Sequence, residues 1–188
     1  MPDFDPMTGG IPSGSVVLLL GEAGAGHQEF ALTSAVHLML HYDDPLMHEF
    51  YLGSAKGPFV YPRGVVYVSV TRSRDQVLNE VQGAFGTSYH DVLSRHLTFH
   101  DLSPSYFADT VVPSSWSSLR SSLLSGHSEA KLGENGPLRG IADALETNAG
   151  TSLVIIDSLT DLLVRRGIEV EDLLTLVKGL RRRAKTWN

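Results

Sequence analysis

The chain has 188 residues, enough for one well-packed domain over residues 1–188, and its 42% hydrophobic content is that of a globular protein. It has no cysteine, which excludes disulfides and thiolate metal sites, and its net charge of −6 argues against non-specific nucleic-acid binding by the domain as a whole. With no apolar run near the roughly 18 residues of a membrane helix and no signal-like start, we expect a soluble, cytoplasmic protein without membrane partners.

The first pattern along the chain is an apolar run, a glycine-rich loop and a helix-like segment. The run covers residues 16–20, and its unbroken apolar character predicts a strand covered on both faces. The segment over about residues 28–40 is apolar nearly all round, which predicts a helix buried between the sheet and a second layer. The loop between them consists of Gly21, Glu22, Ala23, Gly24, Ala25, Gly26, His27 and Gln28.

This loop has the glycines of a phosphate-binding loop but not its charged groups. In the pattern GxxxxGK[ST], backbone N–H groups surround the phosphates, the Lys contacts the β and γ oxygens, and the hydroxyl holds Mg²⁺. Here His27 stands at the Lys position and Gln28 at the hydroxyl position, while Glu22 and Glu29 would repel a triphosphate. We therefore predict weak nucleotide binding unless a partner supplies cations. An ordinary tight turn is the alternative interpretation.

The rest of the chain alternates between strand and helix patterns. Residues 42–64 contain several Pro and Gly residues without a clean period, which favours a connector. The later segments are, in order, a strand at 65–70, a helix at 77–85, a strand at 97–100, a Ser-rich insertion at 113–128 whose spacing allows a short amphipathic helix, a helix at 138–145, a strand at 152–158 and a helix at 170–184. This alternation predicts an α/β fold with a mostly parallel sheet.

The strand at 152–158 contains four apolar residues that are followed by Asp157. An aspartate at the end of a buried strand, about 130 residues after a glycine loop, is the arrangement of a P-loop nucleotide site. In such sites the carboxylate holds Mg²⁺, often through water. We therefore predict Asp157 as the metal-binding residue, with a solvent-facing aspartate at a strand end as the alternative.

Residues 9–21, 66–70 and 153–159 together resemble the RecA superfamily, in its KaiC and RadA-like archaeal branch. The resemblance covers most of the chain apart from residues 42–64 and the Ser-rich stretch. It implies a three-layer α/β sandwich of RecA type, ATP and Mg²⁺ as the cofactors if any bind, and links to signalling and to self-assembly into rings or filaments.

Members of this family have a catalytic glutamate just after the second strand, where Thr71 and Arg72 stand here. A positioned base contributes roughly 10²- to 10⁴-fold to a rate. We therefore expect no catalytic residue, hydrolysis near background, and a degenerate P-loop protein that regulates or scaffolds. One alternative is an active divergent ATPase in which Arg72 or a neighbouring subunit supplies the missing charge. Another is a DNA-associated recombinase paralogue that contacts nucleic acid through Arg181, Arg182 and Arg183.

A second departure from the family concerns the sheet. In the family, a further strand follows the helix after the aspartate strand and lies between that strand and the P-loop strand. The printed sequence stops where this strand should begin. We therefore expect a fold without its final strands, or a sheet closed differently. If the resemblance holds, a gap separates residues 16–20 from residues 153–157, and direct hydrogen bonds between them would contradict this expectation.

Two weaker signals favour ordinary roles. His37 and His41 lie four residues apart on the first helix, a spacing that can bring two imidazoles to one metal, but only His48 is near enough in sequence to be a third ligand. Histidines on a helix face are therefore the preferred interpretation. Arg72 and Arg74 follow a strand and could approach a phosphate, but we interpret them as a surface pair.

Overall fold

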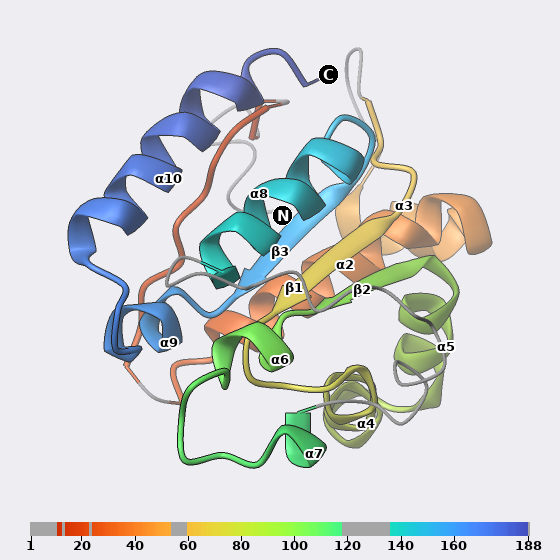
Figure 1. The fold of residues 1–188 in the computed structure, drawn as a ribbon. Coiled ribbons are helices and arrows are strands. Elements are labelled where there is room, and N and C mark those ends of the chain that lie inside the picture. Colours follow the sequence, from red (N-terminus) through yellow and green to blue (C-terminus); the bar gives the residue numbers. More distant parts are fainter. Residues whose placement is uncertain (1–10, 13, 23, 54–59, 118–135, 188) are drawn as a thin grey trace.

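A three-stranded parallel sheet lies at the centre of the molecule (Figure 1). The computed structural model describes residues 11–12, 14–22, 24–53, 60–117 and 136–187. The strands are β1 (Val65–Ser69), β2 (Leu97–Asp101) and β3 (Leu153–Asp157), in the spatial order β2-β1-β3. The central strand β1 pairs in parallel with both neighbours, and the register places Ser69 beside Asp101 and Asp157. The carboxyl ends of all three strands therefore meet at one edge.

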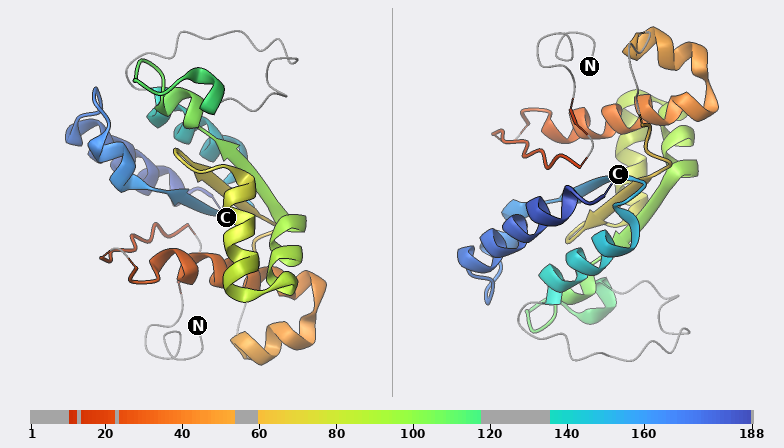
Figure 2. Two further views of the ribbon diagram at one scale, coloured as in Figure 1. Left: turned by 90° about the horizontal axis from the view of Figure 1, so that it is seen from below. Right: turned by 90° about the horizontal axis from the view of Figure 1, so that it is seen from above.

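Helices cover both faces of this sheet (Figure 2). They are α2 (His27–Asp43), α3 (Pro45–Leu52), α4 (Arg74–Phe85), α5 (Thr87–His96), α6 (Ser103–Tyr106), α7 (Ser114–Ser117), α8 (Gly136–Asn148), α9 (Leu159–Val164) and α10 (Val170–Ala184). Alternate residues of β1 point to opposite faces. Val65 and Tyr67 pack with α2, α4 and α5, whereas Val66 and Val68 pack with α8, α9 and α10. The layers are thus helix, sheet and helix.

The sequence-based prediction of an α/β fold with a parallel sheet is confirmed. The strand predicted at 65–70, the strand at 97–100 and the strand at 152–158 correspond to β1, β2 and β3, and the final helix has the predicted bounds 170–184. In the described ranges, no helix is both long enough and apolar enough to cross a membrane. The finer assignment to the RecA type stays a prediction.

The prediction of a first strand at residues 16–20 is wrong. The segment has no strand assignment, and none of its backbone groups is hydrogen-bonded to another described residue. Its five side chains are between 38% and 84% exposed. A strand needs a neighbour to pair with, and β3, the strand on this side of the sheet, pairs only with β1. Among the described residues no hydrogen bond joins residues 16–20 to β3, so the result that would contradict the expected gap is not observed.

The connector predicted at residues 42–64 contains a helix that we did not predict. The side chain of Asp44 accepts a hydrogen bond from the backbone N–H of Met47 at 3.1 Å, and Pro45 occupies the first turn of α3. Ordinary helix-start signals therefore account for residues 45–52, and residues 54–59 of the predicted connector lie outside the described residues. Within the predicted Ser-rich insertion, residues 114–117 form α7, and residues 118–128 lie outside the described residues.

Two helix caps fix the loops that leave the carboxyl edge of the sheet. Ser73 and Gln76 form a capping box at the start of α4, with each side chain bonded to the other residue's backbone N–H. The hydroxyl of Ser158 caps α9 by accepting from the backbone N–H of Asp161 at 3.2 Å. These caps hold Arg72, just before α4, and Asp157, just before α9, at the same edge.

Candidate nucleotide site

The predicted phosphate loop lies immediately before α2. Gly24 and Gly26 have φ values of +82° and +75°, the left-handed region in which glycine is favoured, and Gly26 caps α2 without a side-chain hydrogen bond. A β-carbon at Gly21 would lie 2.9 Å from that of Ala25 and 3.2 Å from Nδ1 of His27, so the imidazole lies close against the loop backbone. The loop is thus a compact turn opening a helix, and Ala23 lies outside the described residues.

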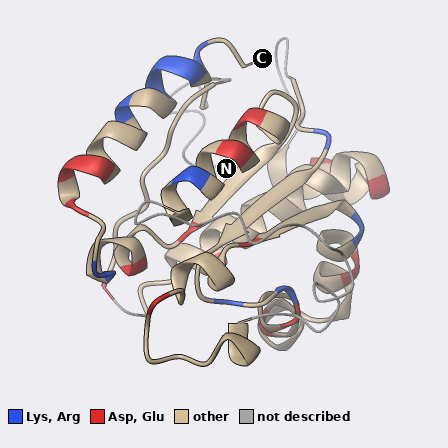
Figure 3. Cartoon of the chain, in the orientation of Figure 1, with Lys and Arg blue, Asp and Glu red and all other residues tan. Residues whose placement is uncertain are grey.

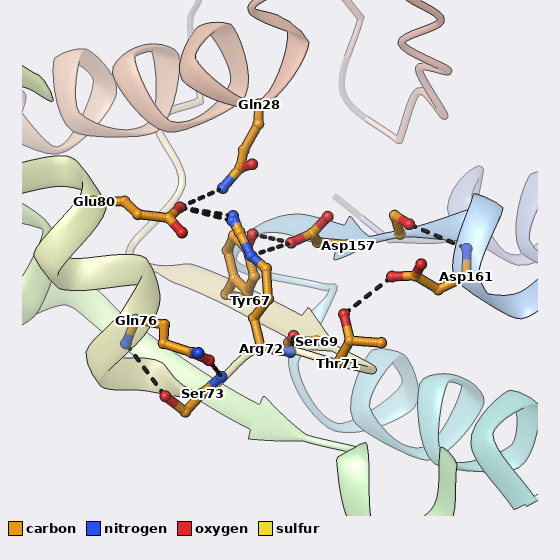
Figure 4. Close-up of polar contacts among 11 residues, drawn as sticks. Gln28, Tyr67, Ser69, Thr71, Arg72, Ser73, Gln76, Glu80, Asp157 and Asp161 are labelled. Carbon is orange, nitrogen blue, oxygen red and sulfur yellow. Dashed lines mark hydrogen bonds and ion pairs between the residues drawn. The ribbon is translucent and has the colours of Figure 1, made fainter. Parts of the chain in front are cut away.

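The loop and Asp157 are brought together through a chain of polar side chains (Figure 4). The amide of Gln28 donates to Oε2 of Glu80 at 3.4 Å, and both terminal nitrogens of Arg72 donate to the same oxygen at 2.8 Å. The Nε of Arg72 lies 3.6 Å from Oδ2 of Asp157. Residues from α2, α4, the loop after β1 and the end of β3 therefore form one network at the carboxyl edge of the sheet.

Asp157 also accepts a short hydrogen bond from the strand next to it. The hydroxyl of Tyr67 donates to Oδ2 of Asp157 at 2.6 Å. Burial raises the pKa of the Tyr67 hydroxyl, and the negative charge of Asp157 and the hydrogen bond to it raise this pKa further. Tyr67 therefore keeps its proton and remains a donor. Oδ2 of the carboxylate predicted to hold Mg²⁺ is engaged by Tyr67 and faces the Arg72 guanidinium.

Arg72 is more enclosed than a surface residue, with a side chain 21% exposed. Its Nε is buried and has no hydrogen-bond partner among the described residues, because the 3.6 Å separation from Asp157 is too long for a hydrogen bond. The interpretation of Arg72 and Arg74 as a surface pair is therefore wrong for Arg72. It holds for Arg74, which is exposed and whose guanidinium donates to the backbone oxygen of Ser94 at 3.4 Å.

Comparison with protein-family models, with curated proteins and with solved structures finds no match to this chain.

Asp157 as the metal-binding residue stays a prediction. In the described ranges no group of three acidic or histidine side chains is placed to hold a metal, but Mg²⁺ usually keeps several waters and is held by one or two carboxylates together with phosphate oxygens. Asp161, the nearest further carboxylate along the chain, accepts a hydrogen bond from the hydroxyl of Thr71 at 3.0 Å. Thr71 and Arg72, which follow β1, thus both bond to neighbouring carboxylates.

A cavity of about 250 Å³ lies between α2 and α4, beside the network. Gln28, Glu29 and Leu32 line it from α2, and Glu80 and Phe85 are among the residues that line it from α4. Two carboxylates at its wall disfavour a polyphosphate, because like charges repel strongly where water is partly excluded. The lining of this cavity therefore gives no support for phosphate binding there.

Aromatic side chains contact His37 and His41 of α2, and His48 lies next to them on α3. The ring of His37 stacks on Tyr51 at 4.2 Å and its Nε2 lies 2.7 Å from the hydroxyl of Tyr89. The ring of His41 stacks on Tyr61 at 4.0 Å, and Nδ1 of His48 bonds to the backbone oxygen of His37 at 2.8 Å. These contacts support the interpretation of ordinary helix-face histidines.

The basic end of α10 lies away from the network (Figure 3). Arg183 donates to both carboxylate oxygens of Glu146, at 3.0 and 3.1 Å, and its guanidinium lies 5.8 Å from the ring centre of Trp187. Arg181 and Arg182 are exposed. One of the three arginines predicted as a nucleic-acid contact is thus engaged within the chain, and nucleic-acid binding stays a prediction.

Sequence reasoning missed Tyr67 and Glu80. Tyr67 interrupts an aliphatic strand, which is a signal that could have been used, because a buried hydroxyl needs a partner. Glu80 lies on α4 among other polar residues, and nothing in its spacing distinguishes it from a solvated helix face. Its role depends on the approach of Arg72 and Gln28 from other elements.

Proposed function

We propose that this chain is a degenerate KaiC/RecA-like P-loop protein with a regulatory or scaffolding role, in which nucleotide binding is weak or absent and hydrolysis is lost. The observation that carries this proposal is the position of the Arg72 guanidinium, between Glu80 and Asp157 at the carboxyl edge of the sheet. In this interpretation a fixed internal cation neutralises the carboxylate that Mg²⁺ would otherwise neutralise.

The charge balance of the site supports weak binding. Arg72 is already paired with Glu80 and faces Asp157, so a phosphate would have to compete with two carboxylates for it. Glu22 lies within the loop and Glu29 directly follows it, so both place negative charge where a phosphate would bind. Because a hydrogen bond to a charged group contributes about 1.5 to 3 kcal/mol, loss of the loop lysine and hydroxyl removes much of the affinity of a working site.

Calorimetric titration with Mg-ATP tests this proposal. We expect no saturable binding by the wild-type chain at micromolar nucleotide, because Arg72, the cation of the network beside the loop, is already paired with Glu80. The double variant His27→Lys/Gln28→Thr restores both groups of the phosphate-loop pattern. It should bind at least about tenfold more tightly than the wild type, as expected from one regained charge-assisted hydrogen bond.

The matched control is Thr147→Lys, which adds the same charge at an exposed position of α8, before the start of β3 and thus at the opposite edge of the sheet. This variant should bind no better than the wild type. Low-micromolar binding by the wild type would contradict the degenerate-site proposal. Equal gains from Thr147→Lys and from the loop variant would show non-specific attraction and would contradict the assignment of the loop.

One observation favours an active divergent ATPase as a second candidate. Arg72 lies within the same network as Gln28, so it could serve as the cation that the loop lacks. This hypothesis predicts Mg²⁺-dependent ATP turnover above the buffer rate, abolished separately by Arg72→Ala and by Asp157→Ala. The degenerate-site proposal predicts buffer-level turnover in all three proteins.

A further inference from the structure

A second cavity lies between α2, α3 and α5, in the helix layer that packs against Val65 and Tyr67 of β1. α3 and α5 both lie beside α2 (Figure 1). The cavity has a volume of about 360 Å³, which is within the range of roughly 300 to 1,000 Å³ of pockets that hold small molecules. It shares no residue with the network around Arg72, so what it binds is a separate question from nucleotide binding.

One side of this cavity is apolar. Val36 and Leu40 of α2 and Val92 of α5 line it, and all three side chains are buried in the core of this layer. We call these three residues the apolar wall. A ligand with an apolar body gains free energy by packing against it, because apolar surface is removed from water.

Two tyrosines, Tyr51 of α3 and Tyr89 of α5, also line the cavity, and His37 of α2 contacts both. The ring of Tyr51 stacks on the imidazole with centres 4.2 Å apart. The hydroxyl of Tyr89 lies 2.7 Å from Nε2 of the same imidazole. These side chains are therefore positioned by contacts within the chain, and a ligand does not have to order them when it binds.

The charged part of the lining is mainly acidic. Among the described residues that line the cavity there are three carboxylates, of Asp43, Asp44 and Asp91, and one guanidinium, of Arg95. Arg95 donates to Asp43 at 2.6 Å, so these two charges offset each other. Oδ1 of Asp91 lies 3.0 Å from Nδ1 of His90, and in the described part of the chain no Lys or Arg pairs with Asp44 or Asp91. The remaining negative charge attracts cations and repels anions.

An organic cation fits this lining better than a metal ion does. In the described ranges no three acidic or histidine side chains are placed to hold a metal, and a metal ion would leave the apolar wall unused. An ammonium or guanidinium group needs only one or two carboxylates as acceptors. The apolar body that carries the group can pack against the wall at the same time.

We propose that the cavity between α2, α3 and α5 binds a small organic cation, in which an ammonium or guanidinium group is carried on an apolar body. The carboxylates of Asp44 and Asp91 bind the charged group, and the apolar wall contacts the body. The inference depends on the cavity alone and does not depend on whether the loop binds nucleotide.

Amide chemical shifts of the whole chain, recorded by NMR, test this proposal with 2-phenylethylammonium as the probe. We expect saturable shifts at Ser88 and Val92, which line the cavity on α5, with a Kd below about 1 mM for a ligand of this size. Val66 and Val68, on the opposite face of β1, should not shift. Absence of saturable shifts at Ser88 and Val92 at probe concentrations several times this Kd would overturn the proposal.

Two analogues of the probe test the need for positive charge. 2-Phenylethanol has nearly the same shape without the charge and should bind at least about tenfold more weakly, because a hydrogen bond between charged groups is lost. Phenylacetate, an anion, should not bind. Equal binding of the alcohol and the ammonium probe would show a merely apolar cavity and would overturn the assignment of a cation.

The variant Asp44→Asn/Asp91→Asn tests the role of the two carboxylates. Asparagine is also a good N-cap, so the start of α3 at residue 44 is kept while the charge is removed. This variant should bind the probe at least about tenfold more weakly than the wild type. The matched control, Asp143→Asn/Glu171→Gln, removes two exposed carboxylates from α8 and α10 on the other face of the sheet and should change binding less than about twofold. Equal weakening in both variants would overturn the assignment of the site.

A lysine side chain of another protein carries the same charged group as a free amine. A peptide with one lysine between alanines and with blocked ends distinguishes the two sources. Because the cavity is small, we expect the peptide to bind more weakly than 2-phenylethylammonium. Shifts at Ser88 and Val92 with the peptide but not with the small probe would overturn the assignment to a small ligand.

Discussion

At the residue scale, the environment of Arg72 changes what the residue does. Next to a strand end and in solvent, an arginine is a free cation that can bind a phosphate. Here its terminal nitrogens donate to Glu80 and its Nε faces Asp157 at 3.6 Å. The same side chain therefore pairs with carboxylates of its own chain. A phosphate that binds Arg72 must first break this pairing, which reduces the free energy of binding.

The hydrogen bond from Tyr67 to Asp157 should contribute measurably to folding stability. Tyr67 is fully buried and its acceptor is a carboxylate, so Tyr67→Phe should lower the free energy of unfolding by about 1.5 to 3 kcal/mol. Urea denaturation followed by circular dichroism measures the change.

The matched control is Tyr106→Phe. The hydroxyl of Tyr106 donates at 3.0 Å to the backbone oxygen of Asp161, which is a neutral acceptor. This variant should lose only about 0.5 to 1.5 kcal/mol. A larger loss for Tyr106→Phe than for Tyr67→Phe would contradict the assignment of a charged acceptor to Tyr67.

At the element scale, Asp43 joins the end of α2 to the end of α5. Its carboxylate accepts from Arg95 at 2.6 Å and lies 2.9 Å from Nε2 of His96. Burial acts to raise the pKa of Asp43, but the hydrogen bonds from Arg95 and His96 outweigh this, and the pKa lies below its usual value. The carboxylate therefore stabilises the fold when ionised, and this contribution is lost as the pH falls through the lowered pKa.

Asp43→Asn should reduce the free energy of unfolding by about 1 kcal/mol at pH 7, a modest value because the Arg95 side chain is 55% exposed. The difference from the wild type should shrink below about pH 4, the usual pKa range of an unfolded aspartate, and disappear at lower pH. Urea titrations at several pH values measure this difference in the free energy of unfolding.

Asp91→Asn, at a carboxylate 53% exposed, serves as control and should change stability by less than about 0.5 kcal/mol. A difference that persists unchanged at acid pH would contradict the role of the charge.

The elements differ in how far the sequence could predict them. α10 was predictable to its bounds because its leucines recur at helical spacing and the helix packs by one face. α3 was predictable in principle, since Asp44 and Pro45 are a standard helix start, but the surrounding prolines suggested a connector. The apolar run at 16–20 was not predictable as an unpaired segment, because pairing depends on which strand lies beside it.

In the candidate site, too, some residues could be predicted from local sequence patterns and others could not. Local pattern located the glycine loop and Asp157, because each follows an apolar run at a recognisable position. It could not locate the contacts of Tyr67, Arg72 and Glu80, which come from a strand, a loop and a helix that meet only in the folded chain. A network of this kind has no sequence period, so its partners can be assigned only from geometry.

At the scale of the whole molecule, the start and the end of the described chain pack together. Gly14 has a φ of +69°, and a β-carbon built there would overlap the backbone oxygen of Ala184 at the end of α10. Trp187 packs with the core residues on the α8 and α10 face, and its ring lies 3.8 Å from the β-carbon position of Gly150. This contact fixes the segment that leads into residues 16–20 against α10.

Gly14→Ala tests this packing of the two ends. The added β-carbon would meet backbone atoms and no flexible side chain, so either α10 or the segment around Gly14 must shift. A non-glycine residue at positive φ adds a second cost. We expect a loss of more than about 2 kcal/mol in the free energy of unfolding.

Gly24→Ala is the matched control, because Gly24 also has a positive φ, +82°, but a β-carbon there would meet nothing within 4 Å. It should lose only about 1 kcal/mol, and equal losses in the two variants would show that the chain ends do not pack as described.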